Sequence, residues 1–107
     1  MANFNITGIE GLSENEKSEA NRIIASSYEK IRRKTKVDFI LEVVVKIYSK
    51  GDLDKKKKHF SIKVRTSGTV RSFESGADDW DMNKALHKAL SAIETEIEHA
   101  FHSSEQH

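Results

Sequence analysis

The sequence of 107 residues contains no cysteine, no proline and only one tryptophan. Without cysteine the chain forms no disulfide, carries no thiolate nucleophile and offers no cysteine ligand to zinc. This composition is consistent with a reducing compartment such as the cytoplasm. No apolar run approaches the ~20 residues of a membrane-spanning helix. The first eleven residues also lack the basic and apolar regions of a signal peptide. We therefore expect a cytoplasmic protein with no membrane partner.

Sequence patterns typical of enzymes are missing as well. There is no Gly-x-Ser-x-Gly nucleophile elbow and no glycine-rich loop of the phosphate-binding kind. Asp78, Asp79 and Asp81 form an acidic group without the spacing of a calcium-binding loop, so capping of the following helix is the simpler interpretation. His99 and His102 lie three residues apart without a fixed third metal ligand. We expect no enzymatic activity, no metal, no other cofactor and no small-molecule substrate.

Charge is unevenly distributed along the chain. Hydrophobic residues make up 36% of the sequence and charged residues 33%, and the formal net charge is only +1. Between Glu29 and Arg71, however, fourteen lysines and arginines accompany five acidic residues, a net charge of +9, and the remainder carries −8. Segregated charge produces a local field that the net value conceals, so this middle third predicts a surface for an anionic partner. A solvated surface without function is the alternative.

Apolar periodicity predicts six elements in the order β-α-β-β-β-α. Ser13 and Glu16 have the spacing of a capping box, in which each side chain accepts a hydrogen bond from the other residue's backbone amide. Residues 67–68, Ser-Gly, have the form of a two-residue hairpin turn, which would place Phe73 opposite Ile62. The elements are expected at about 3–7, 13–34, 37–48, 59–66, 69–75 and 81–101.

Each predicted helix carries one apolar stripe, and the strands share one strongly apolar face. The economical arrangement is an α+β fold with a four-stranded sheet and both helices packed on one of its faces. The other face, with Lys63 and Arg65, is left to solvent or to a partner. A single domain is expected over 1–107, with an ordered core at about 3–101 and a polar C-terminal tail. Trp80 is interpreted as a packed plug rather than a base-stacking platform.

The basic residues of the middle third fall into three groups that the fold has to bring together. They lie at the end of the first helix, in the loop after the second strand and on the following hairpin. Binding of phosphates needs several cations along one face, because each neutralised phosphate releases condensed counterions. Lysine and arginine dominate and exposed aromatics are few, which favours structured RNA over single strands bound by stacking. The candidate RNA-binding residues are Lys30, Arg33, Lys34, Lys55, Lys56, Lys57, Lys58, Lys63, Arg65 and Arg71.

Three segments have the form of motifs from one known family. Residues 4–8 read Phe-Asn-Ile-Thr-Gly, similar to that family's first strand. Residues 67–68 lead through a short strand into Glu-Ser-Gly at 74–76, similar to its third hairpin. Residues 81–86 read Asp-Met-Asn-Lys-Ala-Leu, similar to the Asp-Met-Tyr-x-Ala-Ile that begins its last helix. Over about residues 3–98 the chain resembles the ribosome hibernation-promoting factors and the related ribosome-associated inhibitor, also called protein Y.

This resemblance implies a fold related to double-stranded-RNA-binding domains. It also implies binding to the small ribosomal subunit and its rRNA in the decoding channel, where such proteins occlude messenger and transfer RNA. They suppress translation and protect idle ribosomes under stress. By position, Lys30 and Arg33 match basic residues near the end of the family's first helix. The sequence ends where the short family members end, which predicts that the dimerising C-terminal domain of the long forms is absent.

The last helix departs from the family pattern. That helix is usually rich in lysine and arginine toward its C-terminus, whereas Glu94, Glu96 and Glu98 make this stretch acidic, and Asn83 replaces the usual tyrosine. An acidic helix suits a basic protein partner, and the long strand at 37–48 could pair at an edge. A protein–protein interaction module is therefore the alternative to a ribosome-binding translation inhibitor.

Overall fold

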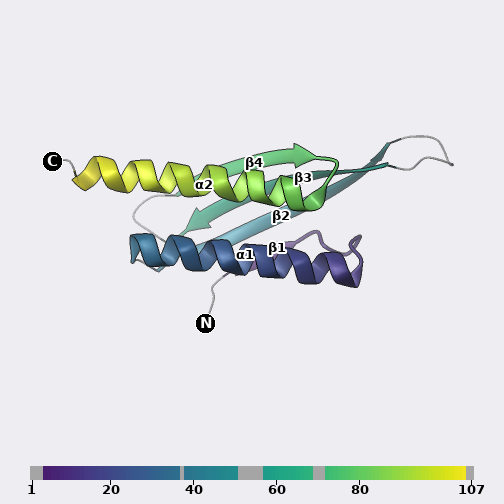
Figure 1. Cartoon of the computed structure of the whole chain (residues 1–107), viewed down its shortest axis with the longest axis horizontal. Coiled ribbons are helices and arrows are strands. Elements are labelled where there is room, and N and C mark those ends of the chain that lie inside the picture. Colours follow the sequence, from purple (N-terminus) through teal and green to yellow (C-terminus); the bar gives the residue numbers. More distant parts are fainter. Residues whose placement is uncertain (1–3, 37, 51–56, 69–71, 106–107) are drawn as a thin grey trace.

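The computed structural model describes residues 4–36, 38–50, 57–68 and 72–105. The chain forms an α+β fold with a four-stranded mixed sheet, as Figure 1 shows. The order β-α-β-β-β-α and the fold class are confirmed. The elements are β1 (Phe4–Thr7), α1 (Glu14–Thr35), β2 (Ile40–Lys50), β3 (Lys57–Ser67), β4 (Phe73–Asp79) and α2 (Met82–Glu105).

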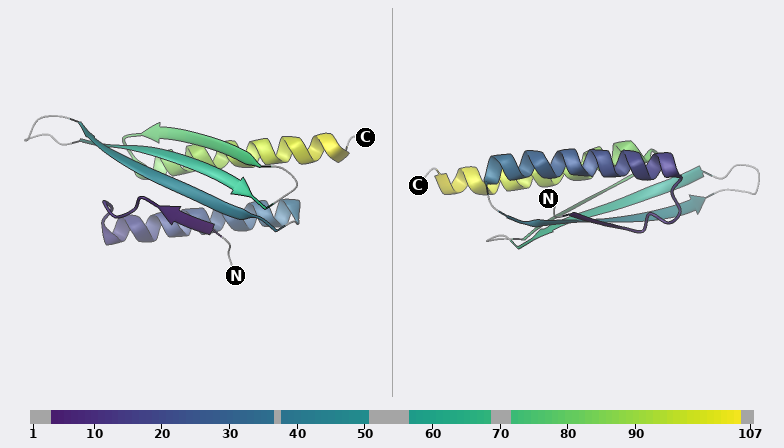
Figure 2. Two further views of the ribbon diagram at one scale, coloured as in Figure 1. Left: turned by 180° about the vertical axis from the view of Figure 1, so that it is seen from behind. Right: turned by 90° about the horizontal axis from the view of Figure 1, so that it is seen from below.

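The sheet has the strand order β1-β2-β3-β4. β1 and β2 are parallel, because α1 carries the chain back between them, and the other neighbours are antiparallel. Both helices lie on one face of this sheet and leave the other face uncovered, as the views in Figure 2 show. Within the described ranges no helix has the length and apolar character needed to cross a membrane.

Alternation along the strands decides which face is covered. Leu41, Val43 and Val45 of β2 are buried, and so are Ile62 and Val64 of β3. Because successive side chains point to opposite faces, the residues between them lie on the uncovered face. The helices complete the core with their apolar stripes, as the sequence pattern predicted. The largest fully buried side chains include Tyr28, Ile24, Leu41, Ile62, Leu86 and Ile93.

Helix α1 begins and ends at caps that satisfy its terminal backbone groups. The Ser13 hydroxyl accepts a hydrogen bond from the Glu16 amide at 3.2 Å, and the Glu16 carboxylate accepts one from the Ser13 amide at 2.9 Å. This confirms the predicted capping box. At the other end Lys36 adopts a left-handed conformation with φ of 57°, and its amide donates to the Arg32 carbonyl oxygen at 2.8 Å.

The turn after β1 depends on Gly8. Its φ is +82°, and a Cβ atom at this position would collide with the carbonyl oxygen of Val45 in β2. Only glycine combines that backbone conformation with so close an approach to a neighbouring strand. The backbone conformation and the close approach of β2 therefore require the glycine that ends the Phe-Asn-Ile-Thr-Gly motif.

The β3–β4 hairpin differs from the sequence prediction. Phe73 pairs with Thr66, and Ile62 pairs with Ala77, so a two-residue turn at 67–68 with Phe73 opposite Ile62 is wrong. β4 also extends to Asp79, through residues expected in a loop. The apolar signal of β4 is weak, and tertiary contacts decide its position: the Ser75 hydroxyl donates to the Ala89 carbonyl oxygen of α2 at 2.7 Å.

Candidate nucleic-acid interface

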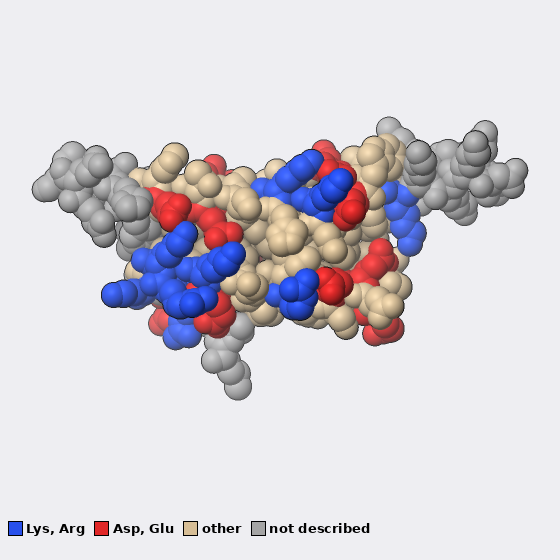
Figure 3. Space-filling view, viewed as in Figure 1, with Lys and Arg blue, Asp and Glu red and all other residues tan. Residues whose placement is uncertain are grey.

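The densest group of basic side chains lies at the C-terminal end of α1. Figure 3 shows lysine and arginine side chains gathered over this end of the helix. Arg32 and Lys36 belong to the group although they are absent from the predicted set, and their position in the last turn and at the cap was the signal that would have found them. We call this group the helix-end cluster; its exposed residues are Lys30, Arg32, Arg33, Lys34 and Lys36.

The acidic part of α2 lies against α1. Lys34 Nζ is 2.7 Å from Glu98 Oε1, and the Ser27 hydroxyl donates to Glu94 Oε2 at 3.2 Å. The hydrogen bond to Glu98 raises the pKa of Lys34, with smaller Coulomb contributions from Glu98 and Glu94. Two of the three glutamates that depart from the family pattern therefore contact α1. In the described part of the chain, Lys30 takes part in no ion pair, so its charge is available to a partner.

Two further candidate cations lie on the uncovered face of the sheet. Lys63 and Arg65 alternate with buried residues of β3 and are exposed. Arg65 pairs with Glu74, its register partner, at 3.4 Å, and this partly neutralises its charge. Lys63 lies between the uncharged register partners Val44 and Gly76. Lys63 is therefore the less neutralised of the two.

The remaining candidates belong to the two hairpins. Lys57 is the first residue of β3, and Lys58 is exposed. Lys55, Lys56 and Arg71 lie outside the described residues.

The structure does not gather the described candidates on one face. The helix-end cluster lies in the helix layer, whereas Lys63 and Arg65 lie on the opposite side of the sheet. Lys58 is near the start of β3, at the end of the molecule far from the C-terminus of α1 (Figure 1). The molecule measures 58 × 26 × 17 Å. The expectation that the fold brings the three groups together is therefore not met.

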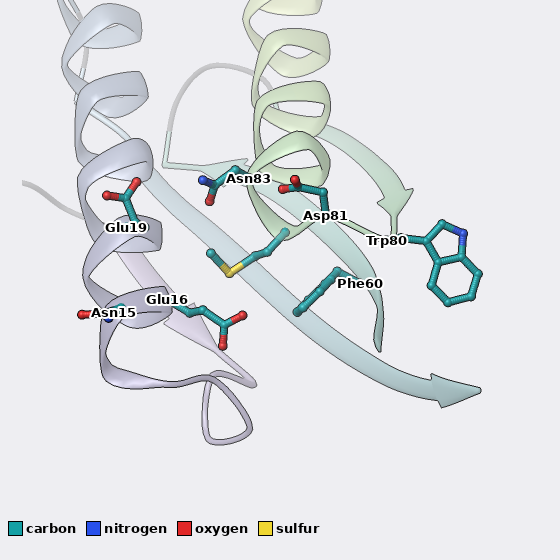
Figure 4. Close-up of a pocket in the computed structure, with 8 residues that line it drawn as sticks. Asn15, Glu16, Glu19, Phe60, Trp80, Asp81 and Asn83 are labelled. Carbon is teal, nitrogen blue, oxygen red and sulfur yellow. The ribbon is translucent and has the colours of Figure 1, made fainter. Parts of the chain in front are cut away.

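A pocket of about 370 Å³ opens between the starts of α1 and α2 (Figure 4). Glu16 is held by the capping box, and Glu19 binds Arg22 at 2.8 Å. The hydrogen bond from Arg22 lowers the pKa of Glu19, so that this carboxylate stays ionised. The pocket thus lies beside carboxylates that already have partners. Its lining residues are Asn15, Glu16, Glu19, Phe60, Trp80, Asp81, Met82 and Asn83.

The acidic group before α2 caps the helix and pairs with it. Asp81 accepts a hydrogen bond from the Lys84 amide at 3.2 Å, and Asp79 accepts one from the Asp81 amide at 3.0 Å. Lys88 Nζ is 2.7 Å from the second Asp79 oxygen. These contacts confirm the capping interpretation. Among the residues that the structure describes, no group of three or more histidines and carboxylates is arranged to hold a metal.

Trp80 is not the packed plug that the sequence suggested. Its residue surface is 52% exposed, and its ring makes an edge-on contact with His59, with a centroid distance of 4.8 Å. In Figure 4 its ring points away from the space between the helices. Asp79 pairs with Phe60, so Trp80 follows beside His59 and not under α2. Because the predicted register of the β3–β4 hairpin was wrong, the sequence did not predict that Trp80 lies beside His59.

The strand proposed for edge pairing is an interior one. β2 lies between β1 and β3, and its pairing with β1 covers Leu41–Val44. Together with the contacts of Glu94 and Glu98 to α1, this position weakens both observations that favoured a protein–protein interaction module.

Comparison with known proteins gives a match in structure only. The sequence matches no family model and no curated protein. The fold is similar to the crystal structure of the N-terminal domain of Protein Y from Thermus thermophilus, with a TM-score of 0.56. The alignment covers 88% of this chain and 91% of that domain at 17% sequence identity. At this identity the similarity establishes a shared fold.

Proposed function

We propose that this protein is a non-enzymatic ribosome-associated hibernation factor that binds small-subunit rRNA and inhibits translation in the cytoplasm under stress. One observation supports the proposal above all. A solved structure with a similar fold is the N-terminal domain of Protein Y, and the motifs at 4–8 and 81–86 independently resemble the family of that protein.

The helix-end cluster is the proposed rRNA contact. Five exposed cations lie within the last two turns and the cap of α1, where the negative end of the helix dipole also favours positive charge. Lysine and arginine bind RNA phosphates with a gain in entropy from released counterions. Because Glu94 and Glu98 make α2 acidic beside this cluster, we propose that α1 rather than α2 lies against the RNA in the decoding channel.

Sedimentation with purified small ribosomal subunits tests the proposal. The wild-type protein is expected to co-sediment at low salt and to dissociate as salt rises, since the contacts are with phosphates. The double variant Lys30→Glu/Arg33→Glu is expected to bind about ten- to a hundredfold more weakly, because two phosphate contacts become repulsive. Absence of co-sedimentation at low salt would refute the proposed function.

A matched variant separates local contact from overall charge. Lys17→Glu/Lys84→Glu changes the net charge by the same amount but lies outside the helix-end cluster. It is expected to bind within about threefold of the wild type, since long-range charge effects are screened by salt. Equal losses for the two double variants would show that the helix-end cluster is not the contact.

A further inference from the structure

Three ring-bearing side chains form a row across the uncovered face of the sheet. Tyr48 of β2 and His59 of β3 are register partners, and the His59 ring contacts the Trp80 ring at a centroid distance of 4.8 Å. Their neighbours Ile47 and Phe60 pack into the core, so alternation turns Tyr48 and His59 to the uncovered face. We call Tyr48, His59 and Trp80 the aromatic row.

The aromatic row is unusually open to solvent. Tyr48 is 49% exposed and Trp80 is 52% exposed, and Ile40 is the other exposed large hydrophobic residue among those described. Exposed apolar groups that are gathered in one place mark interaction sites more often than scattered ones do. The row therefore requires an explanation that the proposed helix-end contact does not supply.

The polar surroundings of the row suit a nucleic acid. Lys46 precedes Tyr48 by two residues and is exposed on the same face, and its register partner is Ser61. Across from Ser61 lies Asp78 of β4. Lys46 and, one step further along β3, Lys63 offer positive charge to a phosphate chain. The Ser61 hydroxyl and the Asp78 carboxylate offer hydrogen bonds to base edges.

Aromatic rings beside cations are the arrangement by which proteins bind single strands. Unpaired bases stack on exposed rings, and lysines follow the backbone, whereas paired bases present no free faces for stacking. Asp78 repels phosphate on the β4 side, so the backbone is expected to run over β2 and β3, past Lys46 and Lys63.

We propose that the aromatic row binds unpaired bases of single-stranded RNA, with Lys46 and Lys63 holding the flanking phosphates. This is a second site, on the opposite side of the sheet from the helix-end cluster, and it does not depend on binding to the ribosome.

The single tryptophan makes the site directly observable. Trp80 is the only tryptophan in the sequence, so tryptophan fluorescence, excited selectively over that of tyrosine, reports on the aromatic row alone. An oligoadenylate of about ten nucleotides is expected to quench this fluorescence on stacking. A blunt RNA duplex of equal length is the comparison, and it is expected to leave the emission nearly unchanged at moderate salt.

Variants then measure the contribution of each ring. Tyr48→Ala and Trp80→Ala are each expected to weaken binding of a labelled oligoadenylate about tenfold, as removal of a stacking ring does elsewhere. Ile40→Ala is the matched control, since Ile40 is 42% exposed at the other end of β2. It is expected to bind within twofold of the wild type. Affinities that are equal for all three variants would overturn the proposal.

The two proposals fail in different experiments. Lys30→Glu/Arg33→Glu is expected to lower binding to the small subunit and to leave oligoadenylate binding within about twofold of the wild type. A loss of oligoadenylate binding in that variant, with no effect of Tyr48→Ala or Trp80→Ala, would overturn the aromatic row as a site.

Discussion

The two faces of β3 differ in burial and in the chemistry of their side chains. Phe60, Ile62 and Val64 point toward the helices and are almost completely buried. His59 and Lys63, only one residue away from them, lie on the face that neither helix covers. Because successive side chains of a strand point to opposite faces, a regular backbone is enough to separate the buried apolar residues from the exposed polar ones. The side chains on one face of the strand therefore stabilise the fold, and those on the other face remain accessible to solvent or to a partner.

The largest effect expected from this comparison is on stability. Ile62→Ala removes a fully buried side chain from the middle of the core and is expected to lower the free energy of unfolding by about 2–5 kcal/mol. Lys63→Ala, the adjacent residue on the other face, is expected to change it by less than about 0.5 kcal/mol. Urea unfolding followed by circular dichroism measures both. Similar losses for the two variants would contradict the division of the strand.

Gly8 tests whether backbone geometry matters as much as side-chain burial. Gly8→Ala places a Cβ against the Val45 carbonyl oxygen at a φ of +82°, and the expected loss of stability is about 1–3 kcal/mol. In Gly11→Ala the added carbon meets only the end of the Ile47 side chain, which can move. Thermal unfolding compares the two variants. Equal melting temperatures would show that the chain after β1 rearranges freely.

The smallest effect concerns the ionised pair between β4 and α2. The hydrogen bond from Lys88, together with the one from the Asp81 amide, lowers the pKa of Asp79 to about 2. A carboxylate whose pKa is lowered by folding stabilises the folded state above its ordinary pKa, and this contribution is lost as pH falls toward 2. Between pH 4 and pH 2, Asp79→Asn is therefore expected to lose less stability than the wild type.

Urea midpoints at a series of acidic pH values measure this difference. At neutral pH the Asp79→Asn variant is expected to be slightly less stable, since it lacks the ionised pair. Because the pair is partly exposed, the change is expected to be smaller than those for Ile62 and Gly8. An unchanged acid dependence would show that another carboxylate governs unfolding in this range.

Particular residues show where prediction from the sequence succeeded. Ser13 and Glu16 predicted the start of α1 because a capping box involves residues three positions apart. The apolar stripes of both helices and the alternation in β2 and β3 likewise predicted the covered face of the sheet, because these patterns also depend on residues close together in sequence. Each of these signals lies within a single element.

The predictions that failed depended on pairing between elements. The predicted register of β4 was wrong because Ser-Gly at 67–68 has the form of a complete two-residue turn. For this reason the exposed position of Trp80 beside His59 was not predicted. The basic residues were expected on one surface, but the fold separates Lys63 from the helix-end cluster by the thickness of the sheet. The distribution of charged residues along a sequence does not show which layer of the fold, the helices or the sheet, will carry them.

The sequence by itself determined the order of the elements, the N-terminal capping box of α1 and the apolar faces that form the core, because these depend on residues a few positions apart. Only the tertiary structure decided that Tyr48, His59 and Trp80 meet on an open face. It also decided that Glu98 and Glu94 contact Lys34 and Ser27. Strand register and helix packing place residues that are distant in sequence side by side. The packing of the whole core stabilises that arrangement, and local sequence preferences do not contain this information.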